Sequence, residues 1–298
     1  MALGTLSRLE KVTVLTGVAA SVSCCINQEI DTRPIAPATV QAATQLVLSM
    51  GGFLFSLLLH WRHSGSFWSP LKLLATSTVF WCTAENVDAA LGGILFGDHP
   101  WDPERMQVPM VGSMPAQQPM SLQWHLYLSL LLADTCLGGL GGLGGLGSPH
   151  GSENVEGISW PRAALGALFA TLLDAAAEPA WLASRLYRYT ACSIEGYCVL
   201  GVDPKNYVSW FLLMSLCYRA FLAWDGLPVL SVAPTSIVII PYVAWSSVLV
   251  WYMNLIAASG GGVGVQLNSL FIGTVPLIFA TCCACTKPRP EVRKQHSS

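Results

Sequence analysis

The residues of this chain that are best suited to chemistry are four carboxylic acids inside long apolar stretches. Glu85 and Asp88 are three positions apart in one stretch, and Asp174 and Glu178 are four positions apart in another. Either spacing places the two side chains on one face of a helix. A carboxylate at the centre of a bilayer costs roughly 2.5 to 3.5 kcal/mol unless it is paired, protonated or hydrated, so such acids are expected to have a function. We expect the two pairs to meet in the folded chain.

Paired, buried carboxyls suit general acid catalysis. Burial disfavours the charged form of a carboxyl, so a protonated acid can persist at neutral pH and give its proton to a weak base such as an isolated alkene. The chain has 11 tryptophans, whose π faces can stabilise a carbocation. Pro179 follows Glu178 directly and leaves the carbonyl of Ala175 without its helical N–H donor, which predicts a kink and a polar pocket beside the acids.

A purely structural use of the acids is the alternative. In that case they would pair with Asn86, or with Arg185, Arg188 or Arg219. Asp134, like Arg219, is isolated from other polar clusters, so these two residues are the best candidates for a structural role.

The elements that must position the acids are membrane helices. Of the 298 residues, 53% are apolar and 11% are charged, whereas an ordinary soluble domain has roughly 25% charged residues. Most of eight apolar stretches reach the roughly 20 residues that a helix needs to cross a bilayer. These stretches cover residues 12–27, 38–61, 70–96, 121–143, 161–183, 206–224, 229–257 and 265–285. No strand-like alternation repeats along the chain, so we expect an all-α, polytopic transmembrane helix bundle of about eight spans.

The first stretch is the weakest of the eight. A signal peptide is the alternative there, with Arg8 and Lys11 as its basic end, and seven spans would then remain. We expect residues 1–286 to form one helical domain and residues 287–298 a basic, disordered cytoplasmic tail.

The distribution of lysine and arginine predicts the orientation. With eight spans, nine of the 15 basic residues lie on one side and five on the other, and Arg219 falls within a span. Both termini are therefore predicted to be cytoplasmic, and the loops 97–119 and 185–205 to share the opposite face. The net charge of −2 argues against a nucleic-acid partner.

Cysteine and glycine runs form patterns that resemble motifs. Cysteines in the apolar stretches are expected to act as small hydrophobic residues: Cys24, Cys82, Cys136 and Cys217. The cluster at 282–285 is a candidate palmitoylation site without a histidine for zinc, and Cys192 could pair with Cys198. The run 138–147 contains GxGxxG, but no strand precedes it, so a flexible loop is expected, with close helix packing as the alternative.

Two segments resemble a known family. Residues 174–179, DAAAEP, and residues 195–210, EGYCVLGVDPKNYVSW, resemble the D-x-x-x-D-P and Y-x-G-V-P-x-x-N-F-x-G-W signature of the integral-membrane carotenoid hydratases, which include bisanhydrobacterioruberin and γ-carotene hydratases. Upstream, Glu85 and the segment 92–101 are similar to that family's E-x-x-G-x-x-x-G-x-x-F-G-x-Y-x-Y stretch, so the match spans about residues 80–212. Departures from the signature include Glu178 for Asp, Tyr207 for Phe, Ser209 for Gly, Asp203 for Pro, and His99 with Trp101 for the aromatic pair.

The resemblance implies addition of water to a terminal C=C bond of an acyclic carotenoid, with no cofactor and no metal. Glu85 or Asp174 would protonate the alkene to a tertiary cation, and another carboxylate would position the attacking water with Asn206. Glu178 is also expected among the catalytic residues. The lipid-soluble substrate would enter laterally from the bilayer. Its expected contacts are Asp88, Phe96, Trp101, Trp124, Tyr197, Tyr207 and Trp210.

Two rival functions remain open at this point. The same cation could be quenched within the substrate, which would make the chain an integral-membrane terpenoid or meroterpenoid cyclase started by alkene or epoxide protonation. A transporter or channel could use intramembrane acids to relay protons or bind cations. No inverted repeat relates the halves of the chain, which argues against a transporter.

Overall fold

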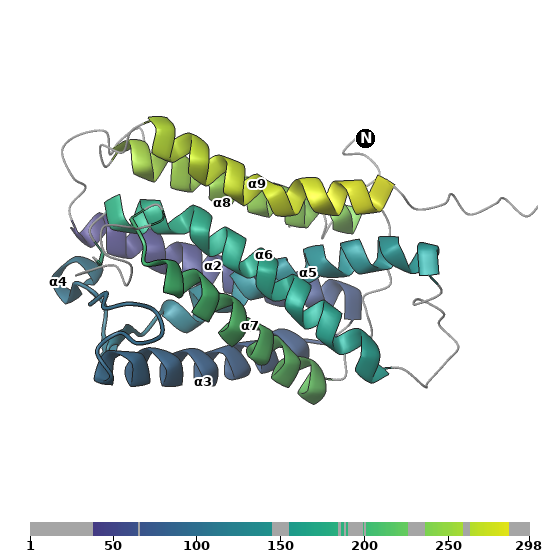
Figure 1. Cartoon of the computed structure of the whole chain (residues 1–298), viewed down its shortest axis with the longest axis horizontal. Helices are drawn as coiled ribbons and strands as arrows, with labels where there is room; N and C mark the ends of the chain where they lie inside the picture. Colours follow the sequence, from purple (N-terminus) through teal and green to yellow (C-terminus); the bar gives the residue numbers. More distant parts are fainter. Residues whose placement is uncertain are drawn as a thin grey trace, which may run out of the picture.

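The computed structural model is a helical bundle in three layers (Figure 1). It describes residues 38–64, 66–144, 155–183, 186, 187, 189, 199, 201–225, 236–258 and 263–285. The long helices are α2 (Ala38–Ser64), α3 (Trp68–Ala90), α5 (Gln118–Gly144), α6 (Val155–Ala183), α7 (Pro204–Asp225), α8 (Ser236–Ala258) and α9 (Val263–Cys285). The prediction of an all-α fold is confirmed for this part of the chain.

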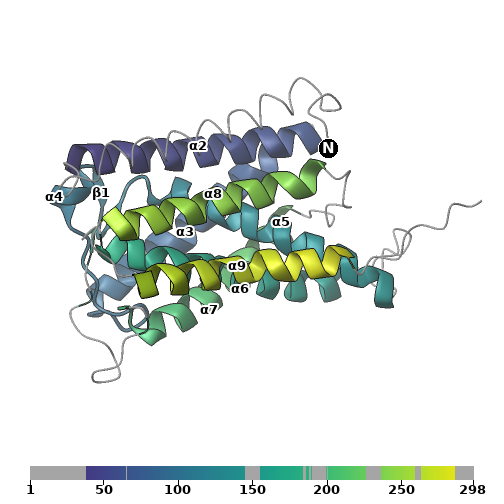
Figure 2. The same ribbon diagram turned by 90° about the horizontal axis from the view of Figure 1, so that it is seen from above.

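The middle layer holds α2, α5 and α6, with α8 and α9 covering one side and α3 and α7 the other (Figures 1 and 2). Helix α6 contacts α5, α7, α8 and α9. Its close approach to these neighbours follows from a run of buried alanines, since small residues let helix backbones come together. The buried alanines of α6 are Ala163, Ala167, Ala170, Ala175, Ala176, Ala177 and Ala180.

Among the residues that the structure describes, three helical segments are long and apolar enough to cross a membrane: Trp160–Leu182, Pro204–Asp225 and Gln266–Cys283. The predicted number of about eight spans is not confirmed by this criterion. The stretch 12–27 and the tail 287–298 lie outside the described residues.

Helix α3 ends earlier than the apolar stretch 70–96 predicts. It stops at Ala90 because Gly92 and Gly93 take up left-handed backbone conformations, with φ of 73° and 78°. The residues that follow turn back over the end of the bundle. The prediction of a helix through to residue 96 is therefore wrong, although the segment is apolar throughout.

The two loops expected on one face do meet at one end of the bundle. The first loop contains α4 (Pro103–Met106) and a short hairpin of β1 (Met110–Val111) and β2 (Met114–Pro115). An isolated bridge joins Trp101 to Tyr187, and the Asp102 amide donates to the Leu186 carbonyl at 2.7 Å. Side chains of the two loops can therefore contribute to one site.

Asn86 on α3 fastens the hairpin to the bundle. Its Oδ1 accepts a hydrogen bond from the Ser113 amide at 2.9 Å, and the Ser113 hydroxyl lies 3.3 Å from the Glu85 carbonyl. The close approach requires glycine at position 112, where φ is 64° and a Cβ atom would lie 1.7 Å from Asn86 Oδ1. The hairpin thus holds its place beside the end of α3 through backbone contacts.

Gly112→Ala is expected to destabilise the protein by at least about 1 kcal/mol more than Gly92→Ala. Both substitutions force an alanine into the left-handed region at a cost of roughly 1 to 2 kcal/mol. Only Gly112→Ala also displaces Asn86 and its hydrogen bonds, because nothing lies within 4 Å of a Cβ at Gly92. Thermal unfolding of both variants in detergent measures the difference. Equal midpoints would contradict this account of the hairpin.

A buried ion pair crosses the other half of the bundle. Arg162 Nε lies 2.5 Å from Asp134 Oδ1, and Nη2 lies 2.7 Å from Oδ2. Both side chains are buried. The expectation that Asp134 has a structural role agrees with this geometry. Arg162 is one of the nine basic residues that the sequence analysis places on the cytoplasmic side, whereas the structure buries it inside the bundle as the partner of Asp134. Arg219 instead lies over the Trp160 ring at 5.7 Å.

The predictions for the glycine and cysteine runs are wrong in part and agree with the structure in part. Residues 138–144 continue α5, so the prediction of a flexible loop is wrong for them; glycine is tolerated in helices of an apolar environment. Cys136 and Cys217 are buried in the core as expected, and Cys82 packs against it. Cys282 is exposed at the end of α9, whereas Cys283 is buried. Residues 24, 192 and 198 lie outside the described residues.

Candidate functional site

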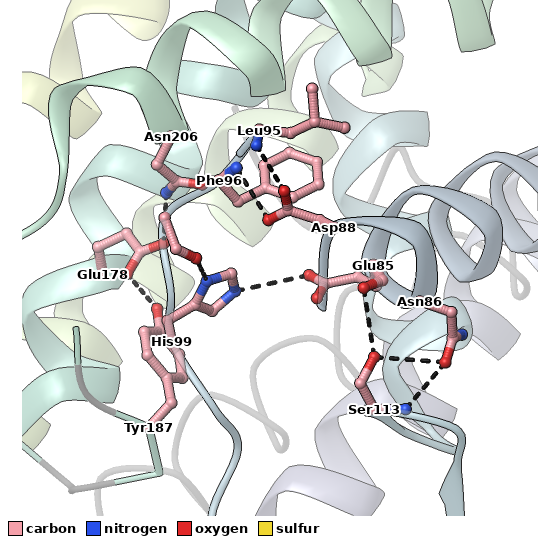
Figure 3. A network of polar contacts seen from close by, with 11 residues as sticks. Glu85, Asn86, Asp88, Leu95, Phe96, His99, Ser113, Glu178, Tyr187 and Asn206 are labelled. Carbon is pink, nitrogen blue, oxygen red and sulfur yellow. Dashed lines mark hydrogen bonds and ion pairs between the residues drawn. The ribbon is translucent and has the colours of Figure 1, made fainter. Parts of the chain in front are cut away.

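Acids from α3 and α6 approach one another at the end of the bundle where the loops meet (Figure 3). His99, from the first loop, lies between them. Its Nε2 is 3.7 Å from Glu85 Oε1, and its Nδ1 is 2.6 Å from the Gly97 carbonyl oxygen. Glu178 of α6 lies on the other side of the imidazole in the same view. The expectation that the two helices bring their acids together agrees with this arrangement.

Two donors hold the carboxylate of Glu178. The Tyr187 hydroxyl donates to Oε2, and Asn206 Nδ2 on α7 donates to Oε1 at 3.1 Å. Burial holds the pKa of Tyr187 well above its usual range, so this phenol stays neutral and keeps its proton for the hydrogen bond. Hydrogen bonds donated to a carboxylate stabilise its anionic form. Both carboxylate oxygens of Glu178 therefore have a hydrogen-bond donor, and one of these donors is Asn206.

His99 carries the positive charge of the site. Burial alone would lower its pKa, but the hydrogen bond and charge of Glu85, with the Gly97 carbonyl, raise the pKa to about 9. At neutral pH the imidazole is thus protonated, and its Nε2 lies beside Glu85 Oε1. An acid already paired with a cation is poorly suited to donate a proton. Of the two acids expected to protonate an alkene, this arrangement favours Asp174 over Glu85.

Replacement of His99 by glutamine is expected to remove a pH-dependent part of the stability. The folded pKa of about 9 lies above the ordinary value of 6.5, so the contribution is complete below pH 6.5 and is lost as the pH rises through 9. Its size is on the order of 3 kcal/mol. Unfolding of wild type and His99→Gln in detergent should differ most near pH 6 and least near pH 10. A difference that grows with pH would contradict the pairing.

Asp174 differs from its neighbour Glu178 in its surroundings. It lies one helical turn away on α6, where its Oδ2 is buried and has no hydrogen-bond partner among the described residues. It lines a cavity of about 30 Å³ between α5, α6, α7 and α8. The other polar groups of that cavity include His125 and Tyr252. Asp174 thus lines the cavity and has a buried oxygen without a hydrogen-bond partner among the described residues.

Asp88, expected to contact substrate, is occupied with the turn that follows α3. Its Oδ1 accepts from the Leu95 amide at 2.5 Å and its Oδ2 from the Phe96 amide at 3.0 Å. Its side chain is buried. These two hydrogen bonds fix the turn that places Phe96 near His99. Asp88 therefore has a structural role beside the site.

Aromatic rings surround the acids. The Trp81 ring packs on Phe96 and Trp210, with centroid distances of 5.4 and 4.5 Å. The Trp101 ring lies 4.8 Å from Tyr187, and Tyr189 stacks on His99 at 5.2 Å. Three of the six aromatic residues that the sequence analysis expects to contact substrate, Phe96, Trp101 and Trp210, therefore lie around the site.

Two more of the expected substrate contacts have structural partners. Trp124 packs its ring against Gly52 of α2, where a Cβ atom would come within 2.6 Å of it, and against His125 with ring centroids 4.2 Å apart. The Tyr207 hydroxyl donates to the Val199 carbonyl at 3.2 Å, which ties the second loop to α7. Tyr197 lies outside the described residues.

Sequence reasoning missed three groups of this site as functional residues: His99, Tyr187 and Tyr189. His99 entered only as a departure from an aromatic pair. The tyrosines lie in a loop beyond Pro179 without any spacing that marks them. One signal was available in the sequence. The loop with His99 follows α3 and the loop with Tyr187 and Tyr189 follows α6, so their side chains can lie near the acids of these helices.

Comparison with known proteins neither supports nor contradicts the resemblance to the carotenoid hydratases. No family model matches the chain, and no significant match was found among curated proteins or among solved structures. Among the described residues, no group of three or more histidine, cysteine, aspartate or glutamate side chains is arranged to hold a metal ion.

Proposed function

We propose that this chain is an integral-membrane hydratase, a hydro-lyase that adds water to a terminal C=C bond of a carotenoid or a related isoprenoid. The observation that carries the proposal is the contrast between two acids one turn apart on α6. Glu178 receives hydrogen bonds from Tyr187 and Asn206, whereas Asp174 has a buried oxygen without a partner among the described residues. Such a contrast assigns one carboxyl as an acid and the other as an anion.

A multi-pass arrangement in the membrane is part of the proposal. Large apolar side chains are exposed along the outer faces of several helices, as a lipid environment requires. They include Leu46, Leu54, Leu58, Val79, Val87, Leu212, Leu216, Leu267, Phe271 and Ile278. This apolar surface is the support for spans beyond the three that hydropathy identifies.

Aromatic rings gather at the end of the bundle opposite the site, as expected where helices leave a bilayer. The exposed rings there are Trp61, Phe67, Trp68, Trp160 and Trp224. Lys72 lies over the Trp224 ring at 5.7 Å and 3.0 Å from Asp225. Tryptophan rings mark both interfaces of a bilayer, so the proposed orientation is supported by the excess of lysine and arginine on this side. Both termini are then cytoplasmic, and the site opens toward the opposite face.

The proposed reaction begins with proton transfer from Asp174. The π electrons of the alkene form a C–H bond with that proton, which leaves a tertiary carbocation and the Asp174 carboxylate. Glu178 stabilises the cation as a fixed negative charge, and the surrounding aromatic faces add cation–π attraction. A water oxygen then forms the C–O bond. Glu85 and His99 neutralise each other and hold the first loop against α3.

Expression in a host that makes lycopene or γ-carotene tests the proposal. The expected product is a more polar pigment that is heavier by one water. Asp174→Asn, expressed and inserted to the same level, is the matched negative control. Unchanged extracts, with the wild-type protein demonstrably in the membrane, would reject carotenoid hydration for these substrates.

Cyclisation is the second candidate, because the aromatic wall formed by Phe96, Trp101 and Tyr187 could shield a cation from water. A cyclase would give a product of the same mass as its substrate. Mass analysis of the pigment therefore separates the two reactions, and a chain that alters no isoprenoid but conducts protons would be a transporter.

A further inference from the structure

A small cavity lies beside Asp174. Helix α5 contributes Gln118, Ser121 and His125 to its wall, and α8 contributes Tyr252. The rest of its lining is apolar and includes Leu122, Leu126, Ala170, Leu173, Ala177, Trp181 and Trp210. The cavity thus combines a few polar groups with an apolar wall, directly beside the carboxyl that we propose as the acid.

The volume of the cavity decides what it can hold. At about 30 Å³ it has room for one or two water molecules, because a single water needs roughly 10 to 15 Å³ measured in this way. The end group of an isoprenoid is several times larger. A buried water also needs two to four polar partners, and the side chains of Asp174, His125, Tyr252 and Ser121 can supply them.

Two of these partners are already fixed in position. The Tyr252 hydroxyl lies 3.3 Å from His125 Nε2, and this contact joins α5 to α8 across the cavity. The Trp181 ring packs edge-on against Tyr252 with centroids 5.7 Å apart, and the Trp124 ring packs on His125 at 4.2 Å. Packing on both sides limits the freedom of the two groups. A water placed between them and Asp174 would therefore have a defined orientation.

We infer that this cavity holds the water that is added to the substrate, and that His125 and Tyr252 position it beside Asp174. The inference rests on the proposed hydratase function and extends it to the source of the nucleophile. Asn206, which was expected to position the water, instead donates to Glu178. His125 and Tyr252 are positioning residues, since they act on the water.

With the water in this cavity, Asp174 can both give the proton to the alkene and regain one from the water. Asp174 gives its proton to the alkene carbon and becomes a carboxylate next to the water. A lone pair of the water oxygen forms the C–O bond with the cation, and one O–H bond of that water breaks. Its proton returns to Asp174. The sum is alkene plus water giving alcohol, and the acid is ready for the next turnover without an external proton.

Reaction in D2O, with the protein reconstituted in liposomes that contain γ-carotene or lycopene, separates protonation from water addition. Wild type is expected to give an alcohol with deuterium on carbon. In Tyr252→Phe and His125→Leu the acid remains, so the alkene is still protonated, but the cation loses a deuteron or proton before water arrives. Recovered alkene then gains deuterium, and the ratio of alcohol to deuterated alkene falls at least about tenfold. His125→Gln, which keeps a hydrogen-bonding group, should restore part of the ratio.

The chain supplies a matched control on the opposite face of α5. His60 Nδ1 lies 3.1 Å from the Tyr127 hydroxyl, and both side chains are buried, but neither lines the cavity. Tyr127→Phe therefore removes a comparable hydroxyl from a comparable histidine. It is expected to leave the ratio of alcohol to deuterated alkene at the wild-type value.

Three outcomes would overturn the inference in distinguishable ways. An unchanged ratio in Tyr252→Phe and His125→Leu, with active wild type, would reject the cavity as the source of water and leave the hydratase function standing. Equal loss of alcohol and of deuterium exchange would show that these residues serve protonation or folding instead. Neither alcohol nor deuterium with wild type would reject the hydratase function itself, and the inference with it.

Discussion

Asp174→Asn is expected to abolish hydration, with a loss of at least about 10²-fold to 10⁴-fold, because an asparagine amide cannot give up a proton to an alkene. The substitution preserves the size of the side chain. Since one oxygen of Asp174 has no hydrogen-bond partner among the described residues, it breaks no bond at that atom. Expression and thermal unfolding should remain close to those of wild type. Pigment analysis in the carotenoid-producing host measures the loss.

Asp225→Asn is the control for that experiment. Asp225 is an acid of low exposure that pairs with Lys72 at the opposite end of the bundle. Its replacement removes a carboxylate of similar burial but lies far from the site, so turnover should persist. Full activity of Asp174→Asn would mean that the acids of α6 have a structural role, and it would contradict the proposed mechanism.

Arg162→Met is expected to cost about 3 to 5 kcal/mol of the free energy of unfolding, since it leaves the buried Asp134 carboxylate without its cation. The bond pattern is bidentate, so both oxygens of Asp134 lose their donors. Unfolding in detergent, by heat or denaturant, measures the loss. No effect on the reaction is expected beyond the loss of folded protein.

The double variant Asp134→Leu with Arg162→Met checks the reason for that loss. Replacement of both partners by apolar residues removes the uncompensated charge, and such exchanges are often neutral. Most of the stability should therefore return. A double variant as unstable as Arg162→Met alone would mean that the ion pair matters for its packing and not for charge compensation.

Most of the helical architecture could be predicted from apolar stretches. Helices α5, α6, α7 and α9 begin and end within a few residues of the expected limits, apart from a longer start of α6. The end of α3 could not be found in this way. Ile94, Leu95 and Phe96 are as apolar as the helix before them, so hydropathy continues across the glycines that stop it.

The candidate site was predictable in its acids and not in their partners. An acid in an apolar stretch is conspicuous because a buried charge costs free energy. This criterion selects Glu85, Asp88, Asp174 and Glu178 alike. Their separate roles depend on contacts that spacing cannot show. Asp88 anchors backbone amides and Glu178 accepts two side-chain donors, whereas Asp174 faces the cavity.

Loop residues were the hardest to assign. His99 gains its charge from Glu85, 14 positions earlier in the chain, and Tyr187 reaches Glu178 only after the chain has turned back beyond Pro179. Arg162 belongs with Asp134 because the start of α6 lies against the end of α5. Each of these pairs forms because helices and loops pack together in the folded chain. The positions of the charged residues along the sequence do not show which residues pair.

The most direct test of the proposed function is the origin of the oxygen in the product. Purified protein in liposomes that contain γ-carotene or lycopene is incubated in water enriched in ¹⁸O, and the pigment is analysed by mass spectrometry. The expected result is an alcohol that carries ¹⁸O in proportion to the enrichment of the water, and no such product with Asp174→Asn. A product isomeric with the substrate, or pigment without ¹⁸O, would contradict the assignment of this chain as a hydratase.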